Sequence, residues 1–401
     1  MLDPLDALDL ADGRCLAITA EVGGLAAVPA VRDPSGRWRR ASAGDGVAEA
    51  LLRVLAGQSG SVTDGRFTVR SWSQRTALGE RAVGVDQTNE SVIVGDTAVV
   101  KWAAHLQEGP HPAAHRIAVL RDAGFDGMPA PWGLITWRPE GGEETLAASV
   151  DEYLPEAVDG WTWAVEMITE AVGCDNADLA FNTVRKVGRL VAELHAALTG
   201  TVTVASQEDA TRWCDGALAT LEVVCTLPES PSVVAARDRR DEMSAVLRRL
   251  GTLAGTPVIG GHGDLHVGQV LRSGGRFWVT DFDGNPVLEA HERMRPIPAA
   301  LDVAGMAQSL AHAGIVAARY TALDADALAE SDVLVRLAFL DAYTSRLAEL
   351  GHADLYDGAA LYPFRLQQVL REIVYAARHL ERWMYVPDAA LPALFDEGEL
   401  P

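Results

Sequence analysis

Residues 261–286, which read GHGDLHVGQVLRSGGRFWVTDFDGNP, bring carboxylates and an amide together at short spacing. Asp264 closes a His-Gly-Asp triplet, Gln269 follows five residues later, and Asp281 comes after a strand-like interval. Phosphoryl transfer from ATP needs a carboxylate near the acceptor hydroxyl and oxygen ligands for Mg²⁺, with little covalent chemistry by the protein. The stretch supplies both kinds of group, in the order found in the catalytic loop and metal motif of eukaryotic-type kinases.

Both the triplet and the lysine at position 101 also have purely structural interpretations. A His-Gly-Asp triplet taken alone is more often a turn whose aspartate accepts backbone hydrogen bonds. Because Gln269 and Asp281 follow in register, we favour the catalytic interpretation. A lysine that ends a strand is usually solvated, but Lys101 and Lys186 are the only lysines among 34 basic residues. A chain that uses arginine for nearly every positive charge indicates that Lys101 stands where a guanidinium does not serve.

Beyond these residues, the chain resembles a known family of kinases. The motifs HGDxHxxQ at 262–269 and DFDG at 281–284 precede LDVAGM at 301–306, and the residues between the last two motifs include Pro286, Arg293, Arg295 and Pro296. This order resembles the aminoglycoside phosphotransferase-like sugar kinases, closest to bacterial maltokinases and their glucosamine kinase relatives. The resemblance extends back to DQTNESVIVGDTAVVKW and forward to the last helices.

The resemblance implies ATP and Mg²⁺ as cofactors and gives roles to residues of this chain. Asp264 would orient and deprotonate the sugar hydroxyl, and Gln269 and Asp281 would hold Mg²⁺. Lys101 would contact the phosphates of ATP. Glu152, Tyr153 and Leu154 would form a hinge whose backbone groups hydrogen-bond to adenine. Thr88, Asn89 and Ser91 would belong to a phosphate-covering loop that lacks glycines. His115 stands where a helical Glu partner of the lysine is expected, so His115 supports Lys101, Glu108 replaces it, or the lysine is held differently.

The acceptor site is expected on the carboxy-terminal stretch 367–388. Polar residues recur there at spacings of three or four, as on one side of a helix: Gln368, Glu372, Tyr375, His379 and Arg382. This side is either solvated or, as the resemblance implies, part of the acceptor wall opposite the catalytic Asp. We favour the wall, with Glu372 as the reader of an amine ahead of Asp283 and Asp388, and with Trp383 or Tyr385 against the sugar ring. His266 and Asp302 are further expected acceptor residues, although Asp302 fits a helix N-cap equally well.

These assignments predict an ATP-dependent sugar kinase whose acceptor is an amino sugar, first of all glucosamine converted to glucosamine 6-phosphate. Maltose phosphorylated at the 1-position is the main alternative, and an aminoglycoside-type antibiotic is the third acceptor. Glucosamine leads because the tail, with RE ahead of YAA and RWMYVPD, resembles the glucosamine kinase branch more than the maltokinase branch. A catalytically silent kinase-like sensor or scaffold is the competing class, although Lys101, Asp264, Gln269 and Asp281 are all present.

Strand-like patterns come first along the chain and helical patterns later, which predicts an α+β fold. We expect a bilobal eukaryotic-type-kinase-like fold, with a β-rich N-terminal cap over 1–84, a small nucleotide lobe over 85–155 and a helical C-terminal lobe over 156–401. The elements expected from periodicity and turn residues are a hairpin over 15–42, helical regions over 46–56, 111–122, 177–198, 231–250 and 299–384, and strands within 66–74, 91–102, 131–138, 145–154 and 258–283. His195, at the end of an apolar helical pattern, is interpreted as a packing or capping histidine.

The composition limits the possible partners. The 401 residues include 34 basic and 56 acidic ones, and the formal net charge of −22 repels the phosphates of nucleic acid and anionic lipid. The four cysteines show no CxxC spacing, the first residues are acidic, and no apolar stretch is long enough to span a membrane. We therefore expect a small-molecule sugar as the partner, no nucleic acid, no membrane, a cytoplasmic location, and a monomer or weak dimer.

Overall fold

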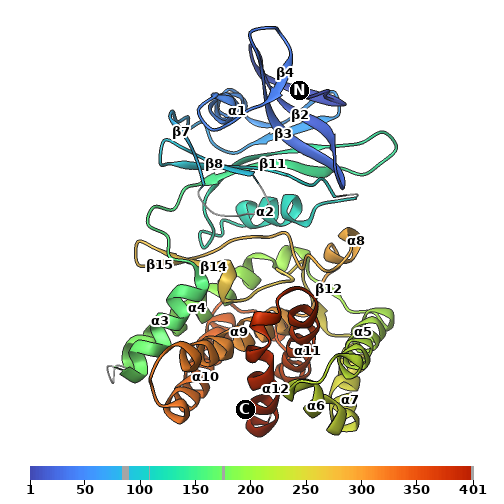
Figure 1. Ribbon diagram of the computed structural model, residues 1–401, viewed down its shortest axis with the longest axis vertical. Coiled ribbons are helices and arrows are strands. Elements are labelled where there is room, and N and C mark those ends of the chain that lie inside the picture. The colour runs from blue at the N-terminus through green and yellow to red at the C-terminus, as the bar shows by residue number, and fades with distance from the viewer. Residues whose placement is uncertain (84–89, 108, 174–176, 399–401) are drawn as a thin grey trace. The chain divides into compact units, whose positions relative to one another are not determined.

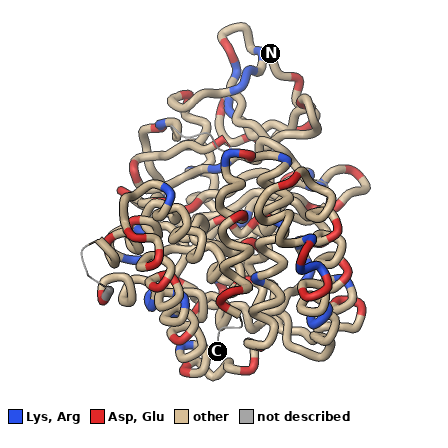
Figure 2. Tube along the Cα trace, turned by 60° about the horizontal axis from the view of Figure 1, so that its bottom comes forward, with Lys and Arg blue, Asp and Glu red and all other residues tan. Residues whose placement is uncertain are grey.

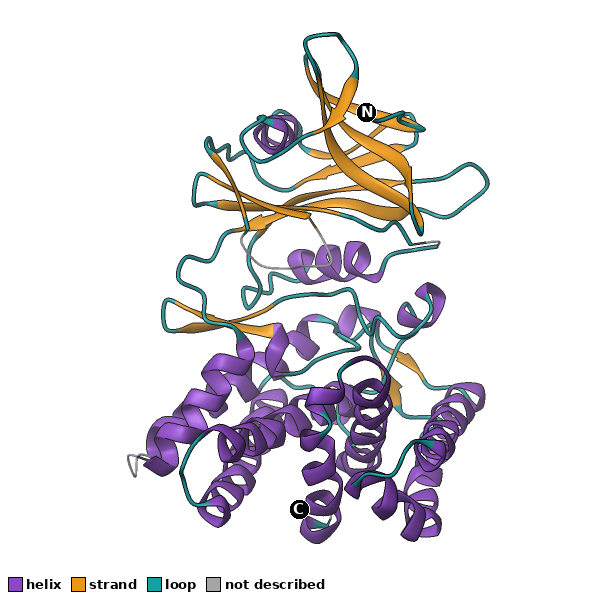
Figure 3. Cartoon of the chain, in the orientation of Figure 1, coloured by secondary structure: helices purple, strands orange, loops and turns teal. Residues whose placement is uncertain are grey.

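The computed structural model describes all residues except 84–89, 108, 174–176 and 399–401. The chain divides into two compact units (Figure 1). Unit 1 comprises Met1–Ala157 together with Asp281–Arg295, and unit 2 comprises Val158–Thr280 together with Pro296–Pro401. Strands are the main regular structure of unit 1, and helices make up most of unit 2 (Figure 3), which agrees with the α+β prediction.

Unit 1 begins with a four-stranded antiparallel sheet in the order β1-β2-β3-β4. Its strands are β1 (Asp6–Ala11), β2 (Arg14–Glu21), β3 (Gly24–Arg32) and β4 (Trp38–Arg40). In the turn between β3 and β4, the Asp33 side chain accepts hydrogen bonds from the backbone of Ser35 and Arg37. Residues 15–42 nevertheless hold three strands rather than one hairpin, because Gly23 and Gly24, at φ 105° and 141°, form a second turn.

A seven-stranded sheet in the order β5-β6-β10-β11-β9-β8-β7 follows. Its strands are β5 (Gly60–Asp64), β6 (Phe67–Ser71), β7 (Glu80–Ala82), β8 (Glu90–Val94), β9 (Ala98–Trp102), β10 (Pro131–Trp137) and β11 (Thr145–Glu152). The helices of unit 1 are α1 (Val47–Ala56), α2 (Pro112–Asp122) and α8 (Ala290–Arg293). The hairpin of β8 and β9 and the start of α2 at its N-cap His111 confirm the sequence-based expectations.

The two sheets of unit 1 share one hydrophobic core. Helix α1 packs against β1, β2 and β3 of the first sheet and against β6 and β8 of the second. Its buried residues Leu51 and Leu55 belong to the same core as Trp102 and Trp132 of the second sheet. The expected boundary at residue 84 lies outside the described residues, but β7 before it and β8 after it belong to the same seven-stranded sheet. Alternating burial identifies the faces of a strand but not the sheet that it joins, so the sequence could not place this boundary.

Unit 2 is built mainly from helices packed around α9. The helices are α3 (Gly160–Gly173), α4 (Ala177–Ala197), α5 (Gln207–Thr226), α6 (Pro231–Asp238), α7 (Arg240–Arg248), α9 (Ala299–Tyr320), α10 (Ala325–Glu349), α11 (Leu361–His379) and α12 (Tyr385–Glu397). The short strands are β12 (Thr203–Val204), β13 (Pro257–Val258), β14 (Val270–Ser273) and β15 (Arg276–Val279). The 3₁₀ turns are η1 (Thr199–Thr201), η2 (Arg249–Thr252), η3 (Val267–Gln269), η4 (Ala353–Leu355), η5 (Gly358–Ala360) and η6 (Glu381–Trp383). Helix α9 packs against α3, α10, α11 and α12, so its side chains reach most of the unit.

Two of the expected helical stretches are interrupted. The stretch 231–250 divides at Arg239, which has φ −109° and ψ 20° between α6 and α7. The stretch 367–388 contains the end of α11 at His379, then η6, then the start of α12, because Leu380 at φ −148° and ψ 59° leaves the helical conformation. Each break involves few residues, so hydrophobic periodicity alone does not reveal it.

The described part of the chain contains no helix with the length and apolarity that a membrane span requires. Acidic and basic residues are interspersed over both units (Figure 2). The excess of acidic residues gives the chain its net charge of −22.

Candidate active site

Asp264 lies in a loop of unit 2 that joins β13 to η3. The backbone of this loop is fixed by Asp302, in the first turn of α9. The Asp302 carboxylate accepts hydrogen bonds from the N–H groups of His262, at 2.7 Å, and Gly263, at 2.8 Å. Burial alone would raise the pKa of Asp302, but His195 and these donors hold it below its ordinary value. Asp302 therefore stays charged and positions the two residues that precede Asp264.

His195, at the carboxyl end of α4, supports Asp302 in turn. Its Nε2 lies 3.4 Å from Asp302 Oδ2, and its Nδ1 lies 2.9 Å from the hydroxyl of Tyr343. The sequence indicated a packing or capping role, whereas the structure places His195 in a fully buried polar cluster beside the catalytic loop. Asp302 itself is not the N-cap of α9, which is Pro298, and it has no exposed surface with which to meet a substrate.

Helix α9 holds the same loop at two further points. A Cβ at Gly305 would lie 2.4 Å from the carbonyl oxygen of Leu265, so the helix and the loop can approach this closely only with glycine here. Ser309 Oγ accepts a hydrogen bond from the N–H of Val267 at 2.9 Å. Asp302, Gly305 and Ser309 are spaced by three and four residues and share one side of α9, which is the platform for the catalytic loop.

His266 and Gln269 lie in this loop as the motif predicts. His266 Nδ1 accepts a hydrogen bond from the N–H of Gly268 at 3.0 Å, and its Nε2 lies 3.4 Å from Gln269 Nε2. The His266 ring is next to Trp161 of α3, with ring centroids 6.3 Å apart. Unit 2 thus holds the predicted base Asp264, His266 and one of the two predicted metal ligands.

Helix α11 places Arg371 and Glu372 within electrostatic reach of Asp264. Burial lowers the pKa of Arg371, and Asp264 and Glu372 oppose this shift. Glu372 Oε1 accepts a hydrogen bond from Gln368 at 2.9 Å. Its Oε2 is buried and accepts no well-aligned hydrogen bond from the described residues, although His312 Nδ1 on α9 lies 3.2 Å away. Burial raises the pKa of Glu372 to about 8, and the charge of Asp264 adds to the shift.

Tyr375 and Arg382, also predicted for the acceptor site, do not share this position. Tyr375 is exposed and lies against His379, with ring centroids 5.4 Å apart, and Arg382 is exposed beyond the end of α11. Trp383 contacts Trp161 edge to face, with ring centroids 5.5 Å apart. The expected continuous polar side is therefore broken, because the helix ends before Arg382.

Asp388, one of the two alternative readers of an amine, has a structural role in unit 2. It accepts hydrogen bonds from the backbone N–H and the hydroxyl of Ser232, at 3.0 and 2.6 Å, and from the hydroxyl of Ser230 at 2.8 Å. These contacts tie α12 to the start of α6. The carboxylate is occupied there by these three donors.

In unit 1, Lys101 on β9 lies among three carboxylates. Its Nζ is 3.7 Å from Asp151 Oδ2 on the neighbouring strand β11. Burial lowers the pKa of Lys101, but Asp151, Asp281 and Asp283 together raise it above its ordinary value, so the ammonium keeps its charge. The partner of Lys101 in the described structure is therefore Asp151. His115, predicted as one possible partner, is exposed on α2, and Glu108 lies outside the described residues.

The segment around Asp281 is held by the buried Arg116 of α2. Arg116 Nη1 donates to the carbonyl oxygen of Phe282 at 2.9 Å, and Nη2 donates to that of Arg293 at 2.8 Å. Asp281 has φ 63°, a left-handed conformation that strains a residue other than glycine and that is typical of functional sites. Arg116 thus supports a strained Asp281 in the same unit as Lys101.

The predicted hinge leaves one backbone donor available. The N–H of Glu152 donates to Ala130 and the N–H of Tyr153 donates to Thr97, both at 2.9 Å. The N–H of Leu154 has no backbone acceptor among the residues that the structure describes. Of the three hinge residues, Leu154 is therefore the one that can donate to a bound base.

Ser91 is the described member of the predicted phosphate-covering loop. It lies opposite Lys101 in the β8–β9 pair, so both side chains are on the same face of the sheet. Its buried Oγ has no hydrogen-bond partner in the described part of the chain. Thr88 and Asn89, also predicted for this loop, lie outside the described residues.

Sequence reasoning did not identify Asp151, Arg116, Arg371 or His312. Arg116 carried a signal, because it falls three residues after Ala113 and four before Leu120 on the apolar side of α2. Asp151 was adjacent to the hinge, but nothing in its neighbourhood distinguished it as the partner of a lysine.

The residues predicted to bind Mg²⁺ offer oxygen ligands. Among the described residues, no group of three His, Cys, Asp or Glu side chains is arranged to hold a metal ion. The donors predicted for Mg²⁺ are the amide oxygen of Gln269, in unit 2, and the carboxylate of Asp281, in unit 1. Both are hard oxygen ligands, which fit this ion chemically.

A β-rich unit with a paired lysine on a strand and a helical unit with an aspartate-bearing loop are the parts of a kinase-like phosphotransferase. No family model matches the chain. A glucosamine kinase of Mycolicibacterium smegmatis is 61% identical over 395 residues, which cover 98% of this chain and 98% of that protein. A glucosamine kinase of Streptacidiphilus jiangxiensis is 44% identical over 98% of this chain and 91% of its own length.

Solved structures give the same relationship. A glucosamine kinase in complex with glucosamine, ADP and inorganic phosphate is 39% identical, has a TM-score of 0.88, and the match covers 98% of this chain and 94% of that one. Another crystal form of a glucosamine kinase is 40% identical with a TM-score of 0.89, over 99% and 94% of the two chains. This chain belongs to the glucosamine kinase family, which confirms the branch that its motifs indicated.

Proposed function

We propose that this protein transfers the terminal phosphoryl group of ATP to the 6-hydroxyl of glucosamine. The observation that carries the proposal is the buried Oε2 of Glu372, in the same unit as Asp264 and without a well-aligned donor among the described residues. A buried acceptor left unsatisfied is costly, and a protonated amine supplies the missing donor. Glucose and maltose are neutral and offer no cation to this carboxylate.

Asp264 would accept the proton of the attacking hydroxyl while Glu372 and Gln368 hold the amine end of the sugar. Arg371 lies within electrostatic reach of both carboxylates and would offset part of their negative charge. Trp383 and Trp161, in edge-to-face contact, would offer an apolar surface to the pyranose ring. His266 would contribute a further polar contact, and Asp302 would act only through the loop.

The nucleotide would be bound by residues of unit 1. Lys101 would contact the phosphates, the hydroxyl of Ser91 would donate to them, and the N–H of Leu154 would bond adenine. Gln269 and Asp281 would hold Mg²⁺, which neutralises charge on the phosphates when it is bound. We assign the reaction to the cytoplasm, where ATP is available.

The test is ADP release measured with glucosamine, glucose, maltose and kanamycin as acceptors. We expect glucosamine to exceed glucose in kcat/KM by about 10- to 150-fold, the ratio that corresponds to a charge-assisted hydrogen bond of about 1.5–3 kcal/mol. Glu372→Gln should remove most of this preference and leave the KM for ATP unchanged. Glu381→Gln, which changes an exposed carboxylate just beyond α11, is the matched control.

Two results would contradict the proposal. A wild-type preference for maltose would overturn the acceptor. An unchanged glucosamine-to-glucose ratio in Glu372→Gln would assign the amine to another residue.

A further inference from the structure

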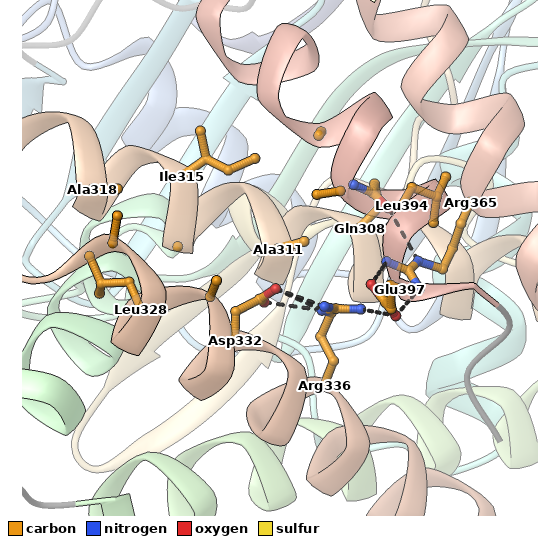
Figure 4. A pocket seen from close by; sticks show the side chains of 15 residues that line it. Gln308, Ala311, Ile315, Ala318, Leu328, Asp332, Arg336, Arg365, Leu394 and Glu397 are labelled. Carbon is orange, nitrogen blue, oxygen red and sulfur yellow. Dashed lines mark hydrogen bonds and ion pairs between the residues drawn. The ribbon is translucent and has the colours of Figure 1, made fainter. Parts of the chain in front are cut away.

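A chain of buried polar side chains connects Glu372 to the far side of unit 2. Its outer part lines a cavity of about 120 Å³ between α9, α10, α11 and α12, and Figure 4 shows the interactions there. The cavity walls are otherwise apolar and include Ile315 and Leu328. In order from the cavity to α11, the interacting side chains are Asp332, Arg336, Glu397, Arg365, Gln308, His312 and Glu372.

The outer members form a rigid anchor for Arg365. Arg336 bonds both oxygens of Asp332 and also donates to Glu397 Oε1 at 2.6 Å. Arg365 donates to the same carboxylate at 2.8 Å. Two arginines, each almost fully buried, thus face two carboxylates, and breaking any of these pairs would leave a charge buried without its partner. Arg365 is therefore held in one position.

The direction of each hydrogen bond along the inner chain follows from Arg365. A guanidinium can only donate, so its Nε, 3.2 Å from Gln308 Oε1, commits the amide oxygen as an acceptor. The amide nitrogen of Gln308 then faces His312 Nε2 at 3.1 Å. An amide nitrogen also only donates, so Nε2 of His312 must accept and its ring proton must be on Nδ1.

This tautomer determines whether His312 presents an N–H group or a lone pair to Glu372. Burial, with Arg365 adding to it, lowers the pKa of His312 to about 3, so the ring is neutral and has a single N–H. That N–H is on Nδ1, 3.2 Å from Glu372 Oε2, while Gln368 donates to Oε1. The Nδ1–H faces Oε2 without forming a well-aligned hydrogen bond with it. Both neighbours therefore present N–H groups rather than lone pairs to Glu372, which favours the carboxylate, the state that can receive an ammonium group.

We propose that Gln308, anchored by Arg365, is a specificity-determining positioning residue, which fixes the tautomer of His312 and thereby keeps Glu372 as the acceptor for the substrate amine. This inference rests on the proposed function, because it assumes that Glu372 binds the amine. Gln308 touches neither the sugar nor the nucleotide in this role. It acts through His312.

The first test is the Gln308→Leu variant, which keeps the approximate size of the side chain but removes both polar atoms. We expect the glucosamine-to-glucose ratio of kcat/KM to fall by about tenfold, through a higher KM for glucosamine, with the KM for glucose unchanged. Ile315→Val, on the same helix and at the same cavity but outside the hydrogen-bond chain, is the matched control and should leave the ratio unchanged.

The second test reads the tautomer directly by ¹⁵N NMR of histidine-labelled protein, with the His312 signals assigned by comparison with His312→Asn. The wild type should show a protonated Nδ1 and an unprotonated Nε2, and Gln308→Leu should show a mixture of the two tautomers. A protonated Nε2 in the wild type would overturn the proposal.

A third comparison keeps the proposal testable if Gln308→Leu fails to fold. Asn at position 312 can place an N–H where Nδ1 stands, whereas Leu cannot, so His312→Asn should retain most of the sugar preference and His312→Leu should lose it. Equal losses would contradict the inference. If Glu372→Gln alters the ratio and Gln308→Leu does not, only this inference fails; if Glu372→Gln does not alter it, the proposed function fails.

Discussion

Asp264 is positioned by its backbone, because Asp302 binds the two N–H groups immediately before it. The Asp264→Asn variant keeps the shape of the side chain and removes its ability to accept a proton. We expect kcat to fall by about 10²–10⁴, with the KM for ATP nearly unchanged. Steady-state ADP release with saturating glucosamine measures the loss, and a variant that keeps more than about a tenth of the wild-type kcat would exclude Asp264 as the base.

The raised pKa of Glu372 predicts that glucosamine binding depends on pH. Because burial raises its pKa to about 8, the free protein holds this carboxyl mainly protonated below pH 8. Pairing with an ammonium group requires the carboxylate, so binding in this range releases a proton. The apparent Kd should therefore rise by up to about tenfold for each unit that the pH falls below 8. Binding should also weaken at higher pH, once the amine loses its own proton.

Calorimetry can count this proton. Titrating glucosamine into the ADP-bound protein at about pH 6.5, in two buffers of different ionisation enthalpy, should give close to one proton released per sugar bound. Glucose should release none, and neither should glucosamine with Glu372→Gln. Binding of glucosamine to the wild type without proton release would contradict the raised pKa of this residue.

How far the sequence could predict the site depends on where each residue has its partners. Asp264, His266 and Gln269 lie within one short segment, and their spacing alone identified the loop. The partner of Lys101 is on a different strand, and that of Glu372 is His312, on a helix far away in the sequence. Such pairs are set by the packing of helices and strands, which periodicity does not specify.

At the scale of elements, α9 determines the position of the catalytic loop. Gly305 is a sensitive contact of this helix, because a Cβ there would lie 2.4 Å from the Leu265 carbonyl oxygen and the backbone would have to move. Misplacing a catalytic group by about 1 Å can cost about 10² in rate. We therefore expect Gly305→Ala to lower kcat by about 10- to 100-fold while the KM for ATP changes little.

A glycine on the same helix provides the control for this variant. A Cβ at Gly314 would lie 3.4 Å from the Cβ of Asp332, an ordinary contact. Gly314→Ala should leave kcat unchanged and raise the free energy of unfolding by up to about 1 kcal/mol, since alanine favours a helix. Comparison of kcat and thermal melting for the two variants separates displacement of the loop from a general effect on α9. Equal kcat values for Gly305→Ala and the wild type would show that the loop tolerates the change.

The elements themselves were predicted best where capping and turn residues marked their ends. His111 and Pro112 stand at the start of α2, within the expected helix 111–122, and Gly95 and Asp96 form the turn between β8 and β9, within the expected strand region 91–102. The end of α11 was missed because Leu380 departs from helical geometry without a glycine or proline beside it. That break separates Arg382 from Glu372, so an error in one helix boundary became an error in the predicted acceptor wall.

At the scale of the whole molecule, the N-terminal sheet and the seven-stranded sheet of unit 1 are joined by the core around α1. Leu55 is 1% exposed in this core, and its methyl groups occupy the space beside Gly133 of β10 that a side chain there would need. Lys101 is on the same seven-stranded sheet. The N-terminal sheet has a small cluster of its own around Cys15 and Val28, but its larger core is shared with the sheet that carries the lysine.

Leu55→Ala should therefore destabilise the cap and the nucleotide-binding sheet together. Removing a buried leucine side chain costs about 2–5 kcal/mol in the free energy of unfolding, which lowers the Tm of a unit of this size by roughly 5–15 °C. We expect ADP binding, measured at increasing temperature, to disappear in the same transition in which unit 1 loses its near-ultraviolet circular dichroism. Arg53→Ala, at a half-exposed position on α1, should change neither measurement by more than about 1 °C. If ADP binding in Leu55→Ala persisted after the N-terminal sheet had melted, the two sheets would be independent, and the N-terminal sheet would be a removable module rather than a structural part of the nucleotide-binding unit.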